Sequence, residues 1–248
     1  MAVQIYYQSI HDIVINEQLL STLQPKRREQ LLSFRFEADK KRCATAGLLL
    51  WEHLYHHHPE CFTVSYAATG KPSVSYRTDF SFDVPNSDIL DSDAPDPSIL
   101  TSSSSVSSSS VSSSSVSNSS ICAPPIPFFN LSHSGDFVML VISDTPVGCD
   151  IERLHKAILS HHVFHPKELA HLRLLPEGDT RNREFLRLWT AKEAFLKAIG
   201  TGIDANASSY DLSSDEPIHL ADGSIWKIEH QSITDFPEYL SCVCYNLL

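Results

Sequence analysis

The chain has 248 residues, of which 42% are hydrophobic and 9% aromatic, and its formal net charge at pH 7 is −11. This length and composition are those of a globular protein with one large domain or two modest ones. The acidic balance, without interleaved basic and aromatic residues, argues against nucleic-acid binding, and no apolar stretch approaches the ~18 residues that span a bilayer.

The N-terminal segment favours a cytoplasmic protein. It lacks the basic start and the apolar block of a signal peptide, and its portion Val3–Tyr7 predicts a first strand. The 6 cysteines of the chain show neither the spacing of a metal site nor that of a disulfide framework. We therefore expect free thiols in the reducing cytoplasm.

Basic side chains cluster in the next segment. Helices are predicted over Glu17–Leu20, Pro25–Phe34 and Ala38–His56, followed by a strand over Phe62–Tyr66. Residues 25–42 carry seven Lys or Arg against three acids, so they can form a local basic patch that attracts an anion despite the acidic net charge. The alternative for these residues is a solvated face of an amphipathic helix.

The middle of the chain is rich in serine. Between residues 98 and 120, 16 of 23 residues are serine, and residues 79–125 contain six Asp and no Lys or Arg. Such a composition cannot bury enough apolar surface to offset its ordering entropy, so we predict a disordered insertion over about 80–125. We interpret it as a surface linker, and a regulatory or phospho-acceptor role is the alternative.

Two strands predicted after the insertion bring acidic residues together. The continuous apolar run Phe137–Ile142 predicts a buried strand, and after a turn Val147–Glu152 predicts the next one. On this second strand Asp150 and Glu152 stand two residues apart, so they face the same side. Further helices are predicted over Lys167–Leu174 and Arg183–Ile199, and further strands over Ile225–Glu229 and Tyr239–Tyr245. We expect an α/β (α+β) fold in two parts, residues 1–145 and 146–248, with a ligand-binding cleft between them.

The last predicted helix carries charges on or beside its apolar face. Apolar residues recur at three- and four-residue spacing from Phe185 to Ile199, and Lys192 falls on that stripe. Glu193 and Lys197 lie along the edge of the stripe. Because burying an unpaired charge is costly, these groups require partners.

The acids of the strand and the helix together predict a metal site. Asp150, Glu152 and Glu193 form an all-oxygen set, which favours Mg²⁺, and Lys192 and Lys197 can supply positive charge to bound phosphates. Each segment alone has an ordinary alternative, namely an i,i+4 ion pair on a surface helix and solvated acids on an edge strand. The two segments taken together favour the metal site.

Other motifs point to no further chemistry. Consecutive histidines at 56–58 and 161–162 cannot all face one metal ion, so zinc is not expected. The segment Ser132-His133-Ser134-Gly135 lacks the elbow motif of α/β-hydrolases, and no P-loop motif occurs.

Four motifs occur in an order that resembles one known family. They are Gly70-Lys71-Pro72, Asn130-Leu131-Ser132-His133-Ser134, the pattern G-x-D-x-E at Gly148–Glu152, and the pattern W-x-x-K-E-A-x-x-K at Trp189–Lys197. Together they are similar to the signature of the 4'-phosphopantetheinyl transferases, and most of all to the larger, surfactin-synthetase-type members. The serine-rich insertion departs from this pattern, because the family joins the first two motifs by a short connection.

The resemblance implies a fold and an activity. The fold is a single chain of two pseudo-symmetric halves, each a small sheet packed with a long helix, with the active site in the cleft between them, and a monomer is expected. The activity is Mg²⁺-dependent transfer of the 4'-phosphopantetheine arm of coenzyme A to a serine of an acyl, polyketide or peptidyl carrier protein, with release of 3',5'-ADP. Another Mg²⁺-dependent phosphoryl or nucleotidyl transferase and an inactive carrier-binding module are the alternatives.

The resemblance also implies roles near the reacting phosphates. Asp150, Glu152 and Glu193 are expected to hold the metal, and Glu193 is also expected to act as the general base or to position it. The residues expected to contact the phosphates are Lys192, Lys197 and His133.

The resemblance places a second group at the 3'-phosphate and adenine end of coenzyme A. This group consists of Arg27, Arg42, Lys71 with its neighbour Pro72, and Ser132, which is expected to shape the nucleotide pocket. The glycine that follows Arg42 in the family pattern stands here one position late, at Gly47.

Overall fold

The computed structural model describes residues 2–55, 62–66, 72–76, 126–203 and 206–247. They belong to one compact unit, which spans Met1–Arg77 and Pro125–Leu248. The predicted insertion at about 80–125, Lys71 and the histidines at 56–58 lie outside the described residues.

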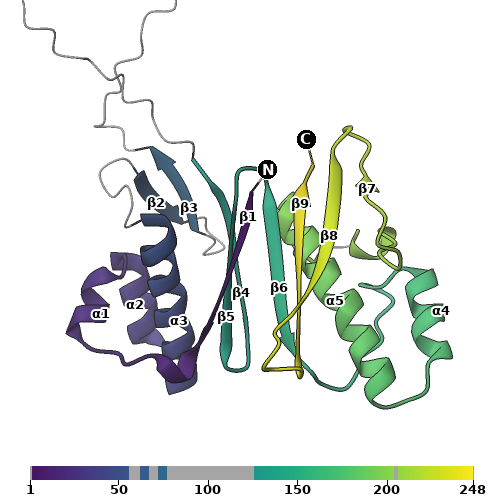
Figure 1. Cartoon of the computed structure of the whole chain (residues 1–248), viewed down its shortest axis with the longest axis horizontal. Coiled ribbons are helices and arrows are strands. Elements are labelled where there is room, and N and C mark those ends of the chain that lie inside the picture. The colour runs from purple at the N-terminus through teal and green to yellow at the C-terminus, as the bar shows by residue number, and fades with distance from the viewer. Residues whose placement is uncertain (1, 56–61, 67–71, 77–125, 204–205, 248) are drawn as a thin grey trace, which may run out of the picture. The chain divides into compact units, whose positions relative to one another are not determined.

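The described residues form an α+β fold, which confirms the predicted fold class (Figure 1). The helices are α1 (Glu17–Thr22), α2 (Pro25–Ser33), α3 (Glu37–Leu50), α4 (Pro166–Leu174) and α5 (Asp179–Ile199). The strands are β1 (Val3–Ser9), β2 (Phe62–Tyr66), β3 (Pro72–Tyr76), β4 (Phe128–Ser134), β5 (Phe137–Ser143), β6 (Val147–Arg153), β7 (Ile218–His219), β8 (Ile225–Ser232) and β9 (Tyr239–Asn246). No helix within the described ranges has the length and apolarity needed to cross a membrane.

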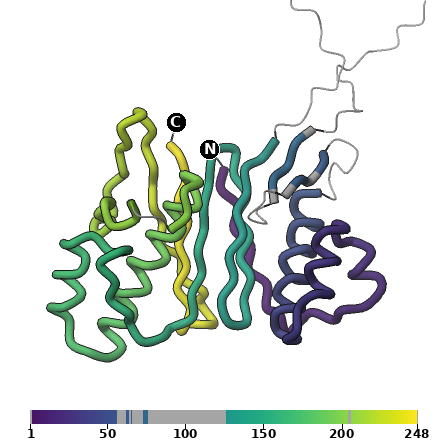
Figure 2. Tube along the Cα trace, turned by 180° about the vertical axis from the view of Figure 1, so that it is seen from behind, coloured from purple at the N-terminus to yellow at the C-terminus, as the bar shows by residue number. Residues whose placement is uncertain are grey.

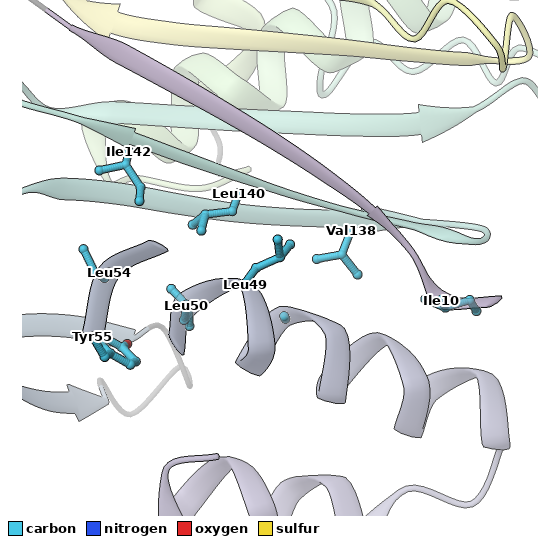
Figure 3. Close-up of a cluster of buried hydrophobic side chains, with 9 residues drawn as sticks. Ile10, Leu49, Leu50, Leu54, Tyr55, Val138, Leu140 and Ile142 are labelled. Atoms are coloured by element: carbon cyan, nitrogen blue, oxygen red, sulfur yellow. The ribbon is translucent and has the colours of Figure 1, made fainter. Parts of the chain in front are cut away.

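The first sheet has the strand order β1-β5-β4 and packs against α3. Its central strand β5 is buried throughout, and successive side chains point to opposite faces. Val138, Leu140 and Ile142 face α3, where they meet Leu49 and Leu50 (Figure 3). The opposite face contributes a second buried group, formed by Phe137, Met139 and Val141.

The second large sheet has the order β6-β9-β8-β7 and packs against α5. Cys149 and Ile151 of β6 belong to the buried cluster that the two sheets share. Asp150 lies between them in sequence, so its side chain points to the α5 side. Figures 1 and 2 show the strands β1, β4, β5 and β6 between the helices α1–α3 and the helices α4 and α5.

The helices and strands differ from the predicted ones in a few places. The helix predicted over Ala38–His56 is α-helical only to Leu50, and Trp51–Tyr55 form a π-helical turn. Helix α5 begins at Asp179, before the predicted Arg183. The strands β3, β4 and β7 are absent from the predicted elements, and β4 is the one that matters for the site.

Candidate active site

A shielded ion pair joins β6 to α5. The Asp150 carboxylate accepts a hydrogen bond of 2.7 Å from Lys197 Nζ, and the two side chains are 5% and 27% exposed, respectively. Lys197 Nζ also donates to the Cys149 carbonyl at 3.2 Å and to Ser132 Oγ at 3.3 Å. The ammonium of α5 is thus held by acceptors from both β4 and β6.

This ion pair depends on the close approach of β6 and α5 at Gly148. A β-carbon at this position would collide with the Ala194 carbonyl oxygen and with the backbone of Ala198. These obstacles are backbone atoms of a packed helix, so they cannot rotate away as a side chain could. The glycine of the G-x-D-x-E pattern therefore allows the contact that brings Asp150 within reach of Lys197.

Asp150 has one satisfied and one unsatisfied oxygen. Its Oδ1 accepts hydrogen bonds from Lys197 Nζ and, at 2.7 Å, from Ser132 Oγ. Its Oδ2 is buried and has no hydrogen-bond partner among the residues that the structure describes. Burial raises the pKa of Asp150, and Lys197 and Ser132 act in the opposite direction. Because a buried carboxylate oxygen without a partner is costly, Oδ2 is a ready ligand position for a cation.

Glu152 and Glu193 belong to the same electrostatic group. Glu152 accepts a hydrogen bond of 2.7 Å from Ser134 Oγ, and burial raises its pKa, with a further contribution from the charge of Asp150. The pKa of Glu193 is raised by burial and also by the charges of Asp150 and Glu152, against the opposing effect of Lys197. The three carboxylates therefore repel one another in a partly desolvated place.

Lys197 remains a cation in this surrounding. Burial alone lowers its pKa, but the charge and the hydrogen bond of Asp150, together with the charge of Glu193, outweigh burial, and the net pKa is raised. Its single positive charge compensates the three carboxylates only in part. The acid group, which we define as Asp150, Glu152, Glu193 and Lys197, thus has a surplus of negative charge.

The donors of the acid group fit a hard divalent cation. Carboxylate oxygens are the ligands that Mg²⁺ prefers, and Mg²⁺ keeps several waters, so it needs few protein ligands. Within the described ranges, no three His, Cys, Asp or Glu side chains already surround a common metal position. The fit therefore comes from the surplus charge and from the unsatisfied Asp150 Oδ2.

A cationic pocket of ≈ 140 Å³ brings together three residues that the family resemblance assigned to coenzyme A. Arg27 comes from α2, Arg42 from α3 and His133 from β4. The remaining lining residues are Gln30, Phe34, Asp39, Cys43 and Ala46. We call this group the cationic pocket.

The two arginines of the cationic pocket are held differently. Arg27 is only 8% exposed, donates to the Cys43 carbonyl at 3.5 Å, and has a buried Nε without a hydrogen-bond partner among the described residues. A β-carbon at Gly47 would lie 2.7 Å from Arg27 Cδ, so the late glycine makes room for this side chain. Arg42 donates to the Gly135 carbonyl and pairs with Asp39, both at 2.6 Å. The two side chains are thus in place before any anion binds.

His133 connects the cationic pocket with the acid group. It lies on β4 between Ser132 and Ser134, whose hydroxyls bond the acids. Burial lowers the pKa of the His133 ring, and the charges of Arg42 and Lys197 lower it further. Since His133 lines the cationic pocket and the Oγ of its chain neighbour Ser132 lies 3.3 Å from Lys197 Nζ, the cationic pocket and the acid group are neighbours.

The structure gives Lys192 a partner that the sequence did not predict. Its position on the apolar stripe is confirmed, because the side chain is 0% exposed. However, its ammonium pairs with the buried Glu168 at 2.8 Å and donates to the Tyr210 carbonyl at 2.6 Å. Lys192 therefore contacts α4 and the segment after α5. The sequence offers no signal that Glu168 is its partner.

The structure does not describe the side chains of two expected site residues, and the sequence analysis missed two others. Lys71 lies outside the described residues, and Pro72 begins β3 without a description of its side chain. Asn130 and Ser134 were not among the expected site residues, yet both contact β6. Their alternation with Ser132 was the signal in the sequence, because it places the three side chains on one side of a strand.

Comparisons with known proteins show similarity to one family. Residues 146–243 match the family model of the 4'-phosphopantetheinyl transferase superfamily. The chain is 40% identical over 84 residues to the 4'-phosphopantetheinyl transferase psf-1 of Bacillus pumilus, a match that covers 33% of this chain and 36% of that protein. It is 34% identical over 90 residues to the 4'-phosphopantetheinyl transferase gsp of Aneurinibacillus migulanus, covering 36% and 38%. It is 43% identical over 84 residues to the 4'-phosphopantetheinyl transferase AcpT of Escherichia coli (strain K12), covering 32% and 43%.

The chain thus spans less than half the length of these curated relatives. The segment that matches the family model contains all four residues of the acid group and the helix that supplies Lys197. The resemblance carried by the sequence motifs is confirmed, because residues 146–243 match the model of the 4'-phosphopantetheinyl transferase superfamily.

Proposed function

We propose that this protein transfers the 4'-phosphopantetheine arm of coenzyme A to a serine hydroxyl of an apo acyl, polyketide or peptidyl carrier protein, with Mg²⁺ as cofactor. The observation that carries this proposal is the position of the cationic pocket next to the acid group, on the two sides of β4. Coenzyme A has a 3'-phosphate and a pyrophosphate, so it needs two anion positions in one site.

The reaction exchanges one phosphorus–oxygen bond for another. The serine oxygen of the carrier attacks the phosphorus atom that bears the pantetheine arm, and a new P–O bond forms. The bond from this phosphorus to the bridging oxygen of the pyrophosphate breaks, and 3',5'-ADP leaves with the electron pair. The serine hydroxyl loses its proton to a base, and the reaction needs no oxidant or reductant.

The acid group supplies charge compensation and the base. A bound Mg²⁺ held by Asp150, Glu152 and Glu193 would stabilise the negative charge that builds up on the phosphates. Lys197 adds a fixed positive charge at the same place. Glu193 acts as the base in this proposal or positions it, because its carboxylate belongs to the same electrostatic group as Asp150, Glu152 and Lys197.

The cationic pocket takes the other end of coenzyme A in this proposal. Arg27 has an unsatisfied buried Nε and Arg42 is anchored by the Gly135 carbonyl, so the 3'-phosphate would meet guanidinium groups that are already ordered. His133 would contact the phosphates from β4. Binding of an anion favours the protonated ring, whose pKa is lowered in the free protein.

We further propose that residues 1–145 and 146–248 act as two halves of one site within a monomer in the cytoplasm. Support comes from β4 and β6, which lie in different sheets of the same chain and contribute neighbouring site residues. Free thiols in the described residues fit a reducing compartment: Cys43, Cys149, Cys242 and Cys244.

The proposal is tested on the nucleotide product. The protein is incubated with coenzyme A, Mg²⁺ and an apo carrier protein, and 3',5'-ADP is quantified by chromatography. We expect release that requires the carrier, stops with EDTA, and falls at least about 100-fold in Glu193→Gln. The matched control is Glu216→Gln, which removes an exposed acid and should release 3',5'-ADP at the parent rate. Release that is independent of the carrier, or equal in Glu193→Gln, would contradict the proposal.

A further inference from the structure

The edges of the two large sheets meet along β4 and β6. β4 is the last strand of the first sheet, and β6 is the first strand of the second sheet. An edge strand presents backbone N–H groups that its own sheet leaves unpaired, and such groups need partners when they are buried. Cys149 and Ile151 of β6 are completely buried, so their N–H groups cannot rely on solvent.

Side chains of β4 supply these partners at regular spacing. The Cys149 N–H donates to Asn130 Oδ1 at 3.3 Å, and the Ile151 N–H donates to Ser132 Oγ at 3.4 Å. The Arg153 N–H donates to Ser134 Oγ at 3.1 Å. The two residues of each pair are 19 positions apart in the sequence. β4 and β6 therefore run side by side in the same direction, and every second residue of each strand takes part in the contacts. We call this row of contacts the polar seam.

Two members of the polar seam also bind the acids. Ser132 Oγ donates to Asp150 Oδ1 and Ser134 Oγ donates to Glu152 Oε2, both at 2.7 Å. A serine hydroxyl has one proton and two acceptor positions. Each hydroxyl therefore receives a backbone N–H of β6 and gives its proton to the carboxylate one residue earlier on the same strand. The register of the two strands and the direction of each carboxylate are thus fixed by the same oxygen atom.

The third member of the polar seam offers an internal comparison. Asn130 bonds the Cys149 N–H, but the residue one position earlier is Gly148, which has no side chain to orient. Asn130 therefore contributes only to the join between the sheets, whereas Ser132 and Ser134 contribute to the join and to the acids.

We propose that Ser134 and Ser132 are positioning residues with two roles. They hold β4 and β6 in register, and they orient Glu152 and Asp150 toward a shared divalent cation. Ser134 is the cleaner case, since Ser132 also contacts Lys197. The part of this inference that concerns the cation rests on the proposed function, and the part that concerns the seam does not.

The seam is tested by amide hydrogen exchange of the full chain, measured by NMR without coenzyme A or metal. In Ser134→Ala we expect the Arg153 amide to exchange at least about tenfold faster, because its acceptor is gone. In Asn130→Ala the Cys149 amide should accelerate in the same way. Ser134→Thr keeps the hydroxyl and should return the Arg153 amide to the parent rate. Unchanged exchange of Arg153 in Ser134→Ala would overturn the seam.

The aiming of the acids is tested by binding of Mn²⁺, followed by electron paramagnetic resonance. Loss of a residue that orients a metal ligand typically weakens metal binding by about 10–100-fold. We expect a loss of this size in Ser134→Ala, recovery in Ser134→Thr, and less than about a twofold change in Asn130→Ala. Parent-like binding in Ser134→Ala, or an equal loss in Asn130→Ala, would overturn the positioning role. If the parent protein binds no Mn²⁺, the proposed function and the aiming role both fail, and the exchange rates still decide the seam.

Discussion

Two lysines of α5 each pair with an acid, and the two pairs differ in how completely the acid is satisfied. Glu168 accepts a hydrogen bond from Lys192 on Oε1 and forms an ion pair with it on Oε2, and it also accepts from the N–H groups of His165 and Leu212. Asp150 has its Oδ1 occupied by Lys197 and Ser132, and its buried Oδ2 has no hydrogen-bond partner among the described residues. One acid is complete within the protein, and the other still has room for a ligand.

The comparison separates a structural ion pair from a functional one. Both acids are almost fully buried, so burial alone does not distinguish them. The difference lies in the spare oxygen of Asp150 and in the neighbouring charges of Glu152 and Glu193, which repel it. A buried ion pair is therefore a candidate site when its hydrogen bonds are incomplete and its charges do not cancel.

The largest expected effect on stability follows from breaking the ion pair between Lys192 and Glu168. Lys192→Met leaves Glu168 buried without its cation, and we expect a loss of about 3–5 kcal/mol in the free energy of unfolding. Urea denaturation measures this loss. The double variant Lys192→Met/Glu168→Leu should recover most of it, because an apolar pair can replace a buried ion pair. A single variant within about 1 kcal/mol of the parent would show that the pair is not structural.

A smaller loss of stability is expected when Asp150 and Lys197 are moved apart. In Gly148→Ala the new methyl group meets backbone atoms of Ala194 and Ala198, so α5 must move away from β6. Overpacking of this kind costs about 1–3 kcal/mol, again measurable by urea denaturation. Transfer should fall as well, since Lys197 loses its contact with Asp150. Parent-like stability and transfer would mean that the close approach at Gly148 has no role.

A gain in stability, rather than a loss, is expected when Glu193, one of the three repelling acids, is neutralised. The folded protein raises the pKa of Glu193, so the stability linked to this group is present below its ordinary pKa and is lost as pH rises through the raised value. Glu193→Gln removes that loss. Without metal, its melting temperature should exceed that of the parent at about pH 8, and this difference should disappear at about pH 4, below the ordinary pKa of the group.

Addition of Mg²⁺ sharpens this prediction. The parent should gain stability from Mg²⁺ at about pH 8, whereas Glu193→Gln should gain less, because a ligand that binds only the folded state raises its apparent stability. Melting curves with EDTA and with Mg²⁺ provide the measurement. A parent that melts higher than Glu193→Gln in EDTA at about pH 8 would contradict the repulsion among the three acids.

The smallest effect on stability is expected at Gly47. An alanine here gains about 1 kcal/mol of helix propensity, but its methyl group displaces the side chains of Leu23 and Arg27. Side chains can move more easily than backbone, so the net change in stability should lie within about 1 kcal/mol. Binding of 3',5'-ADP, measured by calorimetry, should weaken several-fold because Arg27 shifts. Unchanged binding would show that Arg27 does not contribute to binding of 3',5'-ADP in the cationic pocket.

The sequence predicted those parts of the molecule in which one strand or helix determines the outcome. The strands around Phe137–Ile142 and Val147–Glu152 were found because a continuous apolar run and alternating acids are local patterns. The placement of Asp150, Glu193 and Lys197 in one group also followed from local periodicity once the two segments were considered together.

The sequence did not predict features that depend on a distant partner. Strand β4 was missed because Asn130, Ser132 and Ser134 resemble solvent-facing residues until β6 covers them. The pairing of Lys192 with Glu168 was missed for the same reason, since Glu168 lies 24 residues earlier in another helix. Local patterns cannot show which buried charge is satisfied by such a partner.

The most direct test of the central claim is the intact mass of an apo carrier protein after incubation with this protein, coenzyme A and Mg²⁺. The account predicts that the carrier gains the mass of one phosphopantetheine arm on its serine, and that EDTA or Glu193→Gln prevents this gain. If coenzyme A still binds but none of several fatty-acid, polyketide and peptide carriers gains mass, the site is not a phosphopantetheinyl transferase centre.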